Sequence, residues 1–205
     1  MDAKPYDAEV EYLEVSKAGG RAYINTGYIP NGLDNDFNII YMFNGYEFID
    51  SNPAVFGTFS EEAEPIYNLN IARAQSRLMI YNGFNWVENT SFKGIPQIPF
   101  NTGIKTEIGS FADGSYSVNG TYFESGHPNF NNNENFEPLY VFANRVIESY
   151  FIGRIYSLKW WKAKKLTLDL IPVRIGDEGC LYDKVSGKVF HNQGEGRFIL
   201  GPDKN

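Results

Sequence analysis

Carboxylate side chains are the groups in this chain that could catalyse hydrolysis, but their spacing does not favour it. A retaining glycosidase needs two carboxyl groups about 5–5.5 Å apart across the scissile bond. The densest acidic run, residues 61–64, ends at Pro65, and the pair Asp177-Glu178 lies between glycines. Both patterns are typical of solvated loops. The sequence therefore predicts no catalytic residues, and a glycoside hydrolase is the less favoured alternative.

Thiol and imidazole chemistry is equally restricted. Cys180 is the single cysteine, so we expect no internal disulfide and no cysteine-based zinc site. It stands in the short apolar run 179–182, which predicts a small buried hydrophobe. A nucleophile would need a paired histidine. The histidines, His127 and His191, are far apart in the sequence and neither has a nucleophile motif beside it.

Oxygen-bearing side chains between residues 31 and 36 could bind calcium. Hard cations prefer carboxylate and amide oxygens, and Asp34 and Asp36 are the weak candidates for metal ligands. The spacing matches no EF-hand, and Asn and Asp also form turns by bonding to their own backbone. We favour the turn and expect no cofactor, with calcium as the open alternative.

Aromatic residues beside asparagines are the broadest functional signal. The C–H face of a sugar stacks on aromatic rings, while amide and carboxylate groups bond its hydroxyls. Trp160 and Trp161 are consecutive, so on a strand they point to opposite faces. The competing interpretation is that the aromatic rings fill a core. The predicted ligand-binding residues are Trp86, whose neighbours are typical of a loop, with Asn85, Tyr46, Asn44 and Trp161.

The charge of the chain limits its partners. It has 25 acidic and 18 basic residues and a net charge of −7. Nucleic acids and anionic membranes are bound through an excess of clustered lysine and arginine. One basic cluster exists, beside the two tryptophans, and comprises Lys159, Lys162, Lys164 and Lys165. We interpret it as a solvated strand edge, and we expect no nucleic-acid binding and no membrane insertion.

Short strands and turns are the elements that would have to position these residues. The 205 residues are 42% hydrophobic and 16% aromatic, and the 20 glycines and 10 prolines favour turns between strands. Asp36–Phe43 alternates with apolar residues on both faces, which predicts a central strand. The segment 156–170 has helical spacing too, but it also alternates and lacks a capping box, so we favour strands there.

The clearest local signal is a run of three short strands. Segments 104–111, 116–118 and 121–123 are separated by Asp113-Gly114 and Asn119-Gly120. Both dipeptides favour the positive φ angles of type I′ hairpin turns. The sequence therefore predicts a three-stranded antiparallel meander.

The number of strands determines the predicted fold. More than ten strands with almost no helix imply an all-β fold, a sandwich or a barrel. Since the chain is longer than an immunoglobulin-type domain of ~100 residues, we predict a two-sheet antiparallel jelly-roll sandwich. One domain covers residues 9–205, and residues 1–8, which have no signal-peptide core, are expected to be a linker or tail.

Both ends of this domain resemble a known family. The residues that carry the resemblance are Glu11-Tyr12-Leu13-Glu14, Tyr23-Ile24-Asn25-Thr26-Gly27-Tyr28-Ile29-Pro30, and the runs 153–159, 170–174 and 179–190. They are similar to the corresponding parts of concanavalin A-like, or laminin-G-like, jelly-roll domains of gut-bacterial and phage proteins. In such a sandwich we expect the first and last strands to pair, with residues 169–174 beside the first strand.

The resemblance leaves more than one function open, since this group contains lectins, β-glucanases and adhesive modules. The related glucanases carry their acids as E-x-D-x-x-E on one strand, a spacing that this sequence lacks. We therefore expect a non-catalytic recognition module outside the cell or at its surface, with a glycan as its partner. The alternative is a protein-binding or structural module of a surface or phage assembly, with a surface protein as its partner.

Overall fold

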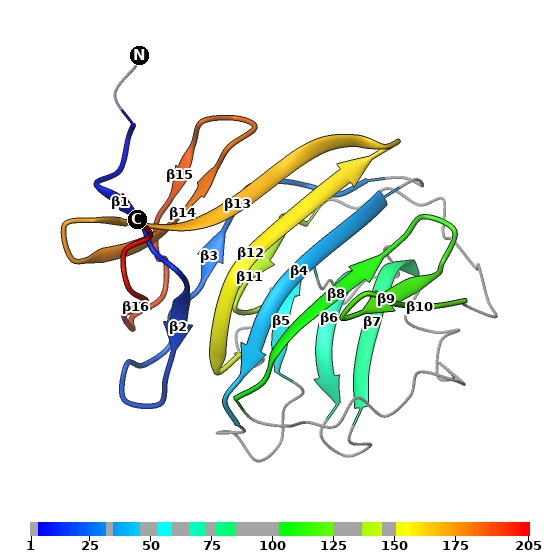
Figure 1. Ribbon diagram of the computed structural model, residues 1–205, viewed down its shortest axis with the longest axis horizontal. Coiled ribbons are helices and arrows are strands. Elements are labelled where there is room, and N and C mark those ends of the chain that lie inside the picture. The colour runs from blue at the N-terminus through cyan, green and yellow to red at the C-terminus, as the bar shows by residue number, and fades with distance from the viewer. Residues whose placement is uncertain are drawn as a thin grey trace.

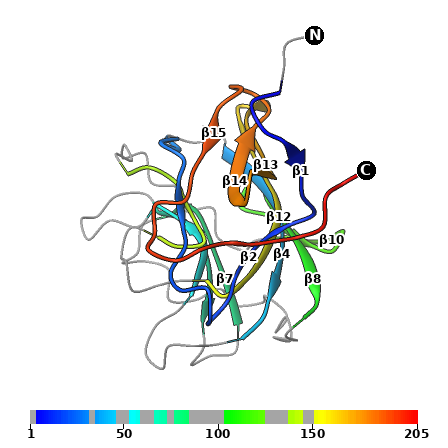
Figure 2. The same cartoon turned by 90° about the vertical axis from the view of Figure 1, so that its left-hand side faces the viewer.

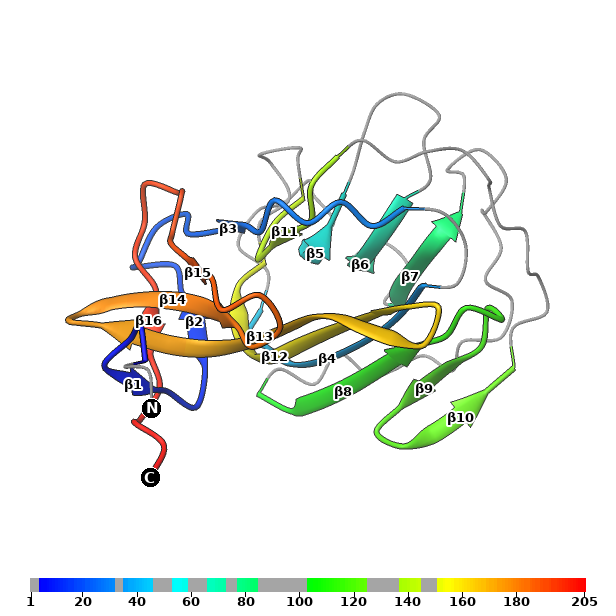
Figure 3. The same cartoon turned by 90° about the horizontal axis from the view of Figure 1, so that it is seen from above.

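The structure is a computed structural model that describes residues 4–31, 35–45, 53–58, 66–72, 77–84, 103–124, 137–144 and 151–205. Within these ranges all the regular elements are β-strands, and all their pairings are antiparallel. Figure 3 shows them as two layers packed face to face. The predicted all-β sandwich is therefore confirmed. In the same ranges no helix is long and apolar enough to cross a membrane.

The larger sheet contains both ends of the domain. Among the described residues its strands are β1 (Ala8–Glu9), β2 (Leu13–Val15), β4 (Asn35–Phe43), β8 (Lys105–Ser110), β9 (Tyr116–Val118), β10 (Thr121–Phe123), β12 (Gly153–Lys162), β13 (Lys165–Ile175), β14 (Glu178–Asp183), β15 (Val189–Phe190) and β16 (Ile199–Leu200). The main path has the order β10-β9-β8-β4-β12-β13-β14-β15. At its side, β1 pairs with β13, and β2 pairs with β12 and β16 (Figure 1).

The smaller sheet covers one face of the larger one. In the described part of the chain it consists of β3 (Ile24–Asn25), β5 (Ala54–Gly57), β6 (Ile66–Ala72), β7 (Arg77–Phe84) and β11 (Tyr140–Val141). These strands are hydrogen-bonded in the order β3-β11-β5-β6-β7.

The core between the sheets follows from the period-two pattern of β4. Phe37, Ile39, Tyr41 and Phe43 are buried in one cluster with residues of both sheets. Trp160 on β12 is fully buried, with its ring centroid 5.4 Å from that of Phe37. The central strand predicted over Asp36–Phe43 is confirmed, since β4 lies between β8 and β12.

The segment 156–170 forms two strands and no helix. β12 and β13 are joined by Ala163 and Lys164, both with positive φ (48° and 64°), and Lys162 pairs with Lys165. This geometry is a two-residue type I′ hairpin. The rejection of the helical alternative is therefore confirmed.

The meander is present, but one of its turns differs from the prediction. β8, β9 and β10 pair in sequence, and Asn119 and Gly120 have φ of 47° and 80°, as a type I′ turn requires. The first turn is a five-residue loop instead, since Ser110 pairs with Tyr116 and the Phe111 amide donates to the Ser115 carbonyl. The type I′ prediction for Asp113-Gly114 was wrong, because the strands separate before they reach it.

The two chain ends meet at one end of the sandwich (Figures 1 and 2). Leu13 pairs with Leu200, and Ala8 pairs with Arg174, as expected for the first and last strands. The Tyr6 ring is buried in a second, smaller apolar cluster. The ordered packing therefore extends into the segment 1–8 that the sequence assigned to a linker.

Candidate functional site

A cavity of about 640 Å³ lies at one end of the larger sheet. Four separate segments form it: the start of β4, the β8–β9 loop, β10 and the β12–β13 turn. They meet at the upper right of Figure 1. The lining residues are Asp36, Phe111, Ala112, Asp113, Ser115, Tyr122, Ala163 and Lys164.

Two aromatic rings provide the apolar part of this cavity. The Phe111 and Tyr122 ring centroids are 5.9 Å apart, with an interplanar angle of 38°. Tyr122 is 55% exposed, so part of its ring is open to solvent. Gly109 makes the arrangement possible, because a Cβ there would lie 3.3 Å from the Phe111 ring and 2.6 Å from the Ser117 hydroxyl. The missing side chain leaves the Phe111 ring room to lie over the strand.

Two carboxylates provide the polar part. Asp36 accepts a hydrogen bond from the Ala112 amide at 2.6 Å, which ties the β8–β9 loop to β4. Asp113 accepts bonds from the Ser115 amide, at 2.9 Å, and from the Ser115 hydroxyl. These bonds lower the pKa of Asp113. Asp113 is therefore an anion at neutral pH, and it lines the cavity.

Asp113 does not have the pKa that the general acid of a glycosidase needs. A glycosidase acid must hold its proton at working pH, which requires a raised pKa. Asp113 has the opposite shift. The exposed Tyr122 ring and the half-buried Phe111 ring lie beside carboxylate acceptors and Lys164, and they offer a stacking surface with hydrogen-bonding groups at its border.

None of the predicted ligand-binding residues that the structure describes lines this cavity, but Trp161 neighbours a residue that does. Trp161 is half-buried on β12, and its cross-strand partner is Asp36, which lines the cavity. Trp160 is in the core, so the two rings do lie on opposite faces of the sheet. Trp86, Asn85, Tyr46 and Asp34 lie outside the described residues, so their roles, and the calcium alternative, stay predictions.

Asn44 lies at the other end of β4. It is eight residues from Asp36, and at about 3.4 Å per strand residue this corresponds to roughly 27 Å. Its amide donates to Glu14 at 3.2 Å, and Glu14 also forms an ion pair with Arg154 at 2.6 Å. The Arg154 guanidinium lies 4.1 Å from the centroid of the Tyr12 ring. The described residues therefore do not bring Asn44 to the cavity that Trp161 borders.

Sequence reasoning missed most of the cavity. Phe111, Asp113 and Tyr122 were interpreted only as parts of strands and turns. The sequence did contain a signal for Tyr122. It precedes Phe123, which faces the core, in the short strand after the Asn119-Gly120 turn, so Tyr122 has to point to the opposite face. Nothing in the sequence placed it beside Asp36, since that contact depends on the register of β8 against β4.

A second group of polar side chains surrounds Cys180. The thiol is buried in the smaller apolar cluster, as predicted, but it is not isolated from histidine. His191 Nδ1 lies 3.5 Å from its sulfur and 3.0 Å from a carboxylate oxygen of Glu178. The β14–β15 hairpin brings His191 beside Cys180, a contact that sequence reasoning did not consider. One ligand atom from each of the three residues lies within 4.8 Å of the others.

Comparison with solved structures agrees with the fold. The chain aligns with the crystal structure of a "putative carbohydrate binding protein" from Bacteroides ovatus, with a TM-score of 0.58 and 13% sequence identity. The alignment covers 97% of this chain and 61% of that protein, so this chain spans about three-fifths of its length. At this identity the likeness shows a shared fold alone. In sequence, the chain matches no protein-family profile and no curated protein.

Proposed function

We propose that this protein is a non-catalytic carbohydrate-recognition domain of the concanavalin A-like jelly-roll kind, and that it binds glycans in the cavity between Phe111 and Tyr122. The observation that carries the proposal is the exposed Tyr122 ring, paired with Phe111 and bordered by two carboxylates. The fold shared with the Bacteroides ovatus protein supports it. Trp161, which borders the cavity, is included in the proposed site.

The chemistry of the cavity indicates the class of glycan. Its volume of about 640 Å³ lies within the range of small-ligand sites, about 300–1,000 Å³. Asp36 and Asp113 would repel sulfated or uronic-acid sugars, and the net charge of −7 adds to that repulsion. We therefore propose a neutral glycan or an amino-sugar glycan as the ligand. Such a role places the domain outside the cell or on its surface.

A panel of neutral, amino-sugar and acidic glycans, titrated while Trp fluorescence is recorded and followed by calorimetry, tests this proposal. We expect Tyr122→Ala to lower the affinity for the best glycan at least tenfold, because the stacking surface is lost. Tyr122→Phe should keep most of the affinity, since the ring remains. Val185→Ala is the matched control, because Val185 is also exposed but lies in the β14–β15 turn, away from the cavity.

The same panel separates the alternatives. Binding that is unaffected by Tyr122→Ala but lost in Trp86→Ala would move the site to the aromatic loop predicted from the sequence. No response to any glycan would contradict the proposal and favour a protein-binding or structural module. Release of reducing sugar from any member of the panel would favour a glycoside hydrolase.

A further inference from the structure

We propose that Glu178, Cys180 and His191 form a binding site for one divalent cation of the zinc class, which replaces the expectation from the sequence that Cys180 belongs to no zinc site. The site is independent of the proposed glycan site, since the two share no residue: it lies on β14 and just beyond β15, while the cavity is formed by the start of β4, the β8–β9 loop, β10 and the β12–β13 turn (Figure 1).

The hairpin geometry brings the three side chains to one face. Glu178 and Cys180 are two residues apart on β14, so their side chains point to the same side of the sheet. Leu181 pairs with Phe190, and the same register puts His191 opposite Cys180. The three residues therefore share a face because of strand periodicity and pairing, and not because of a flexible loop.

The distances fit a tetrahedral metal site with little movement. With Zn–S of about 2.3 Å and Zn–N or Zn–O of about 2.0–2.1 Å, sulfur and nitrogen ligands lie about 3.5 Å apart and nitrogen and oxygen ligands about 3.3 Å apart. The sulfur of Cys180 is 3.5 Å from His191 Nδ1, and that nitrogen is 3.0 Å from Glu178 Oε1. Thiolate, imidazole and carboxylate together favour zinc over calcium or magnesium.

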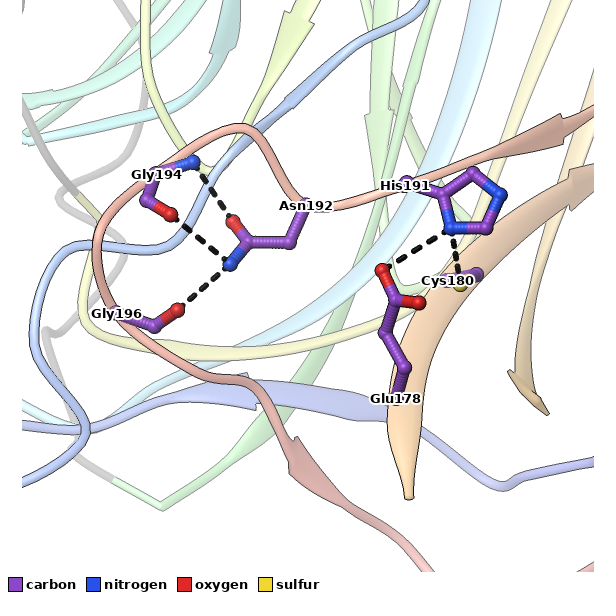
Figure 4. A network of polar contacts seen from close by, with 6 residues as sticks. All are labelled: Glu178, Cys180, His191, Asn192, Gly194 and Gly196. Atoms are coloured by element: carbon purple, nitrogen blue, oxygen red, sulfur yellow. Dashed lines mark hydrogen bonds and ion pairs between the residues drawn. The ribbon is translucent and has the colours of Figure 1, made fainter. Parts of the chain in front are cut away.

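The arrangement does not fit a catalytic relay. In a nucleophile–histidine–acid triad, the nucleophile and the acid bond to different ring nitrogens. Here the Cys180 sulfur and the Glu178 carboxylate both approach His191 Nδ1, as Figure 4 shows. Three donor atoms that lie within 4.8 Å of one another suit a shared cation instead.

The backbone on both sides of His191 is held in place. Before it, Asp183 accepts bonds from the Val185 and Ser186 amides, at 3.1 and 3.0 Å, which closes the β14–β15 turn. After it, the Asn192 side chain donates to the carbonyls of Gly194 and Gly196, at 3.2 and 2.6 Å (Figure 4). Such supporting bonds keep a metal ligand oriented before the ion arrives.

Access is open on one side. The side chains of Glu178 and His191 are 47% and 55% exposed, while Cys180 is buried. Glu178 also lines a cavity of about 320 Å³ together with Asn192 and Phe198. A cation could therefore enter from solvent, take the buried sulfur as its innermost ligand and keep its fourth position for water or for a group from the cavity.

Cobalt(II) titration of the chelator-treated, untagged protein tests this site, because a thiolate bound to cobalt gives a charge-transfer band in the near ultraviolet. We expect one equivalent to saturate the band and zinc to abolish it by displacing cobalt. Cys180→Ser should remove the band, His191→Ala should weaken binding at least tenfold, and Glu178→Gln should weaken it while keeping the band.

His127→Ala is the matched control, since His127 is the other histidine of the chain, and it should bind like the unmodified protein. Circular dichroism checks that each variant folds; His191 is exposed, so its replacement should leave the fold intact even if Cys180→Ser does not. A saturated protein without a charge-transfer band would overturn the proposal. So would a folded His191→Ala variant with unchanged cobalt affinity.

Discussion

Asn35 shows how a single polar residue can be required by the core. The sequence grouped it with the possible calcium ligands, but its side chain is only 3% exposed. Its carbonyl oxygen accepts a bond from Trp160 Nε1 at 3.0 Å, and its amide donates to the Tyr67 hydroxyl at 3.2 Å. The ring nitrogen of the largest buried side chain is satisfied in this way, so the core can include a tryptophan at low cost.

Replacing Asn35 should therefore cost far more than replacing its neighbour Asn38. Asn35→Ala would leave the Trp160 Nε1 donor buried without its acceptor and would remove the bond donated to the Tyr67 hydroxyl, and we expect a loss of about 2–4 kcal/mol in unfolding free energy. Asn38 bonds to Glu107 at 2.7 Å in an exposed position, so Asn38→Ala should change stability by about 0.5 kcal/mol or less. Urea denaturation measures both. Equal losses would show that the buried network adds nothing.

Among the elements, the β12–β13 hairpin has an unfavourable turn sequence. Ala163 and Lys164 both adopt positive φ, which non-glycine residues reach at a cost of roughly 1–2 kcal/mol. Ala163→Asn should stabilise the hairpin by about 0.5–1 kcal/mol, because Asn favours the first position of a type I′ turn. Thermal unfolding should show a higher Tm. An unchanged or lower Tm would mean that the turn is not of this type in solution.

The elements also show what the sequence could and could not predict. Alternation over Asp36–Phe43 and the Asn119-Gly120 turn gave correct strands, because both signals are local. The Asp113-Gly114 turn was misjudged, since Asp-Gly also occurs within longer loops. The glycan cavity needs the register of β8 and β12 against β4, which no local pattern determines.

The cation site depends both on a local turn and on the register of the hairpin. Asp183 and Gly187 are residue types typical of a turn, and they stand between the apolar residues Tyr182 and Phe190. In the observed register Tyr182 pairs with Val189, which puts His191 opposite Cys180, and period two then adds Glu178. The turn alone does not determine this register, because a turn over 183–187 would place Phe190 opposite Cys180. The site was missed because the two histidines were judged by their distance in sequence.

For the whole molecule, the last 31 residues are expected to be essential. β14 pairs with β13, and β16 pairs with β2. Leu181 and Phe198 also belong to the main core. Truncation after Arg174 should therefore abolish the cooperative thermal transition. Truncation after Asp203 is the control, because it keeps the bonds between Arg174 and Asp203, both 2.8 Å, and should shift Tm by no more than about 5 °C. A truncation at Arg174 that melts like the full chain would contradict this account.

The central claim is that the whole sandwich presents one recognition surface, the cavity between Phe111 and Tyr122. The most direct test is a crystal structure of the protein with the glycan that binds best in the panel. We predict a sugar ring stacked on Tyr122, with its hydroxyls within hydrogen-bond distance of Asp36 or Asp113. A glycan bound elsewhere, with Tyr122 still exposed to solvent, would contradict the claim.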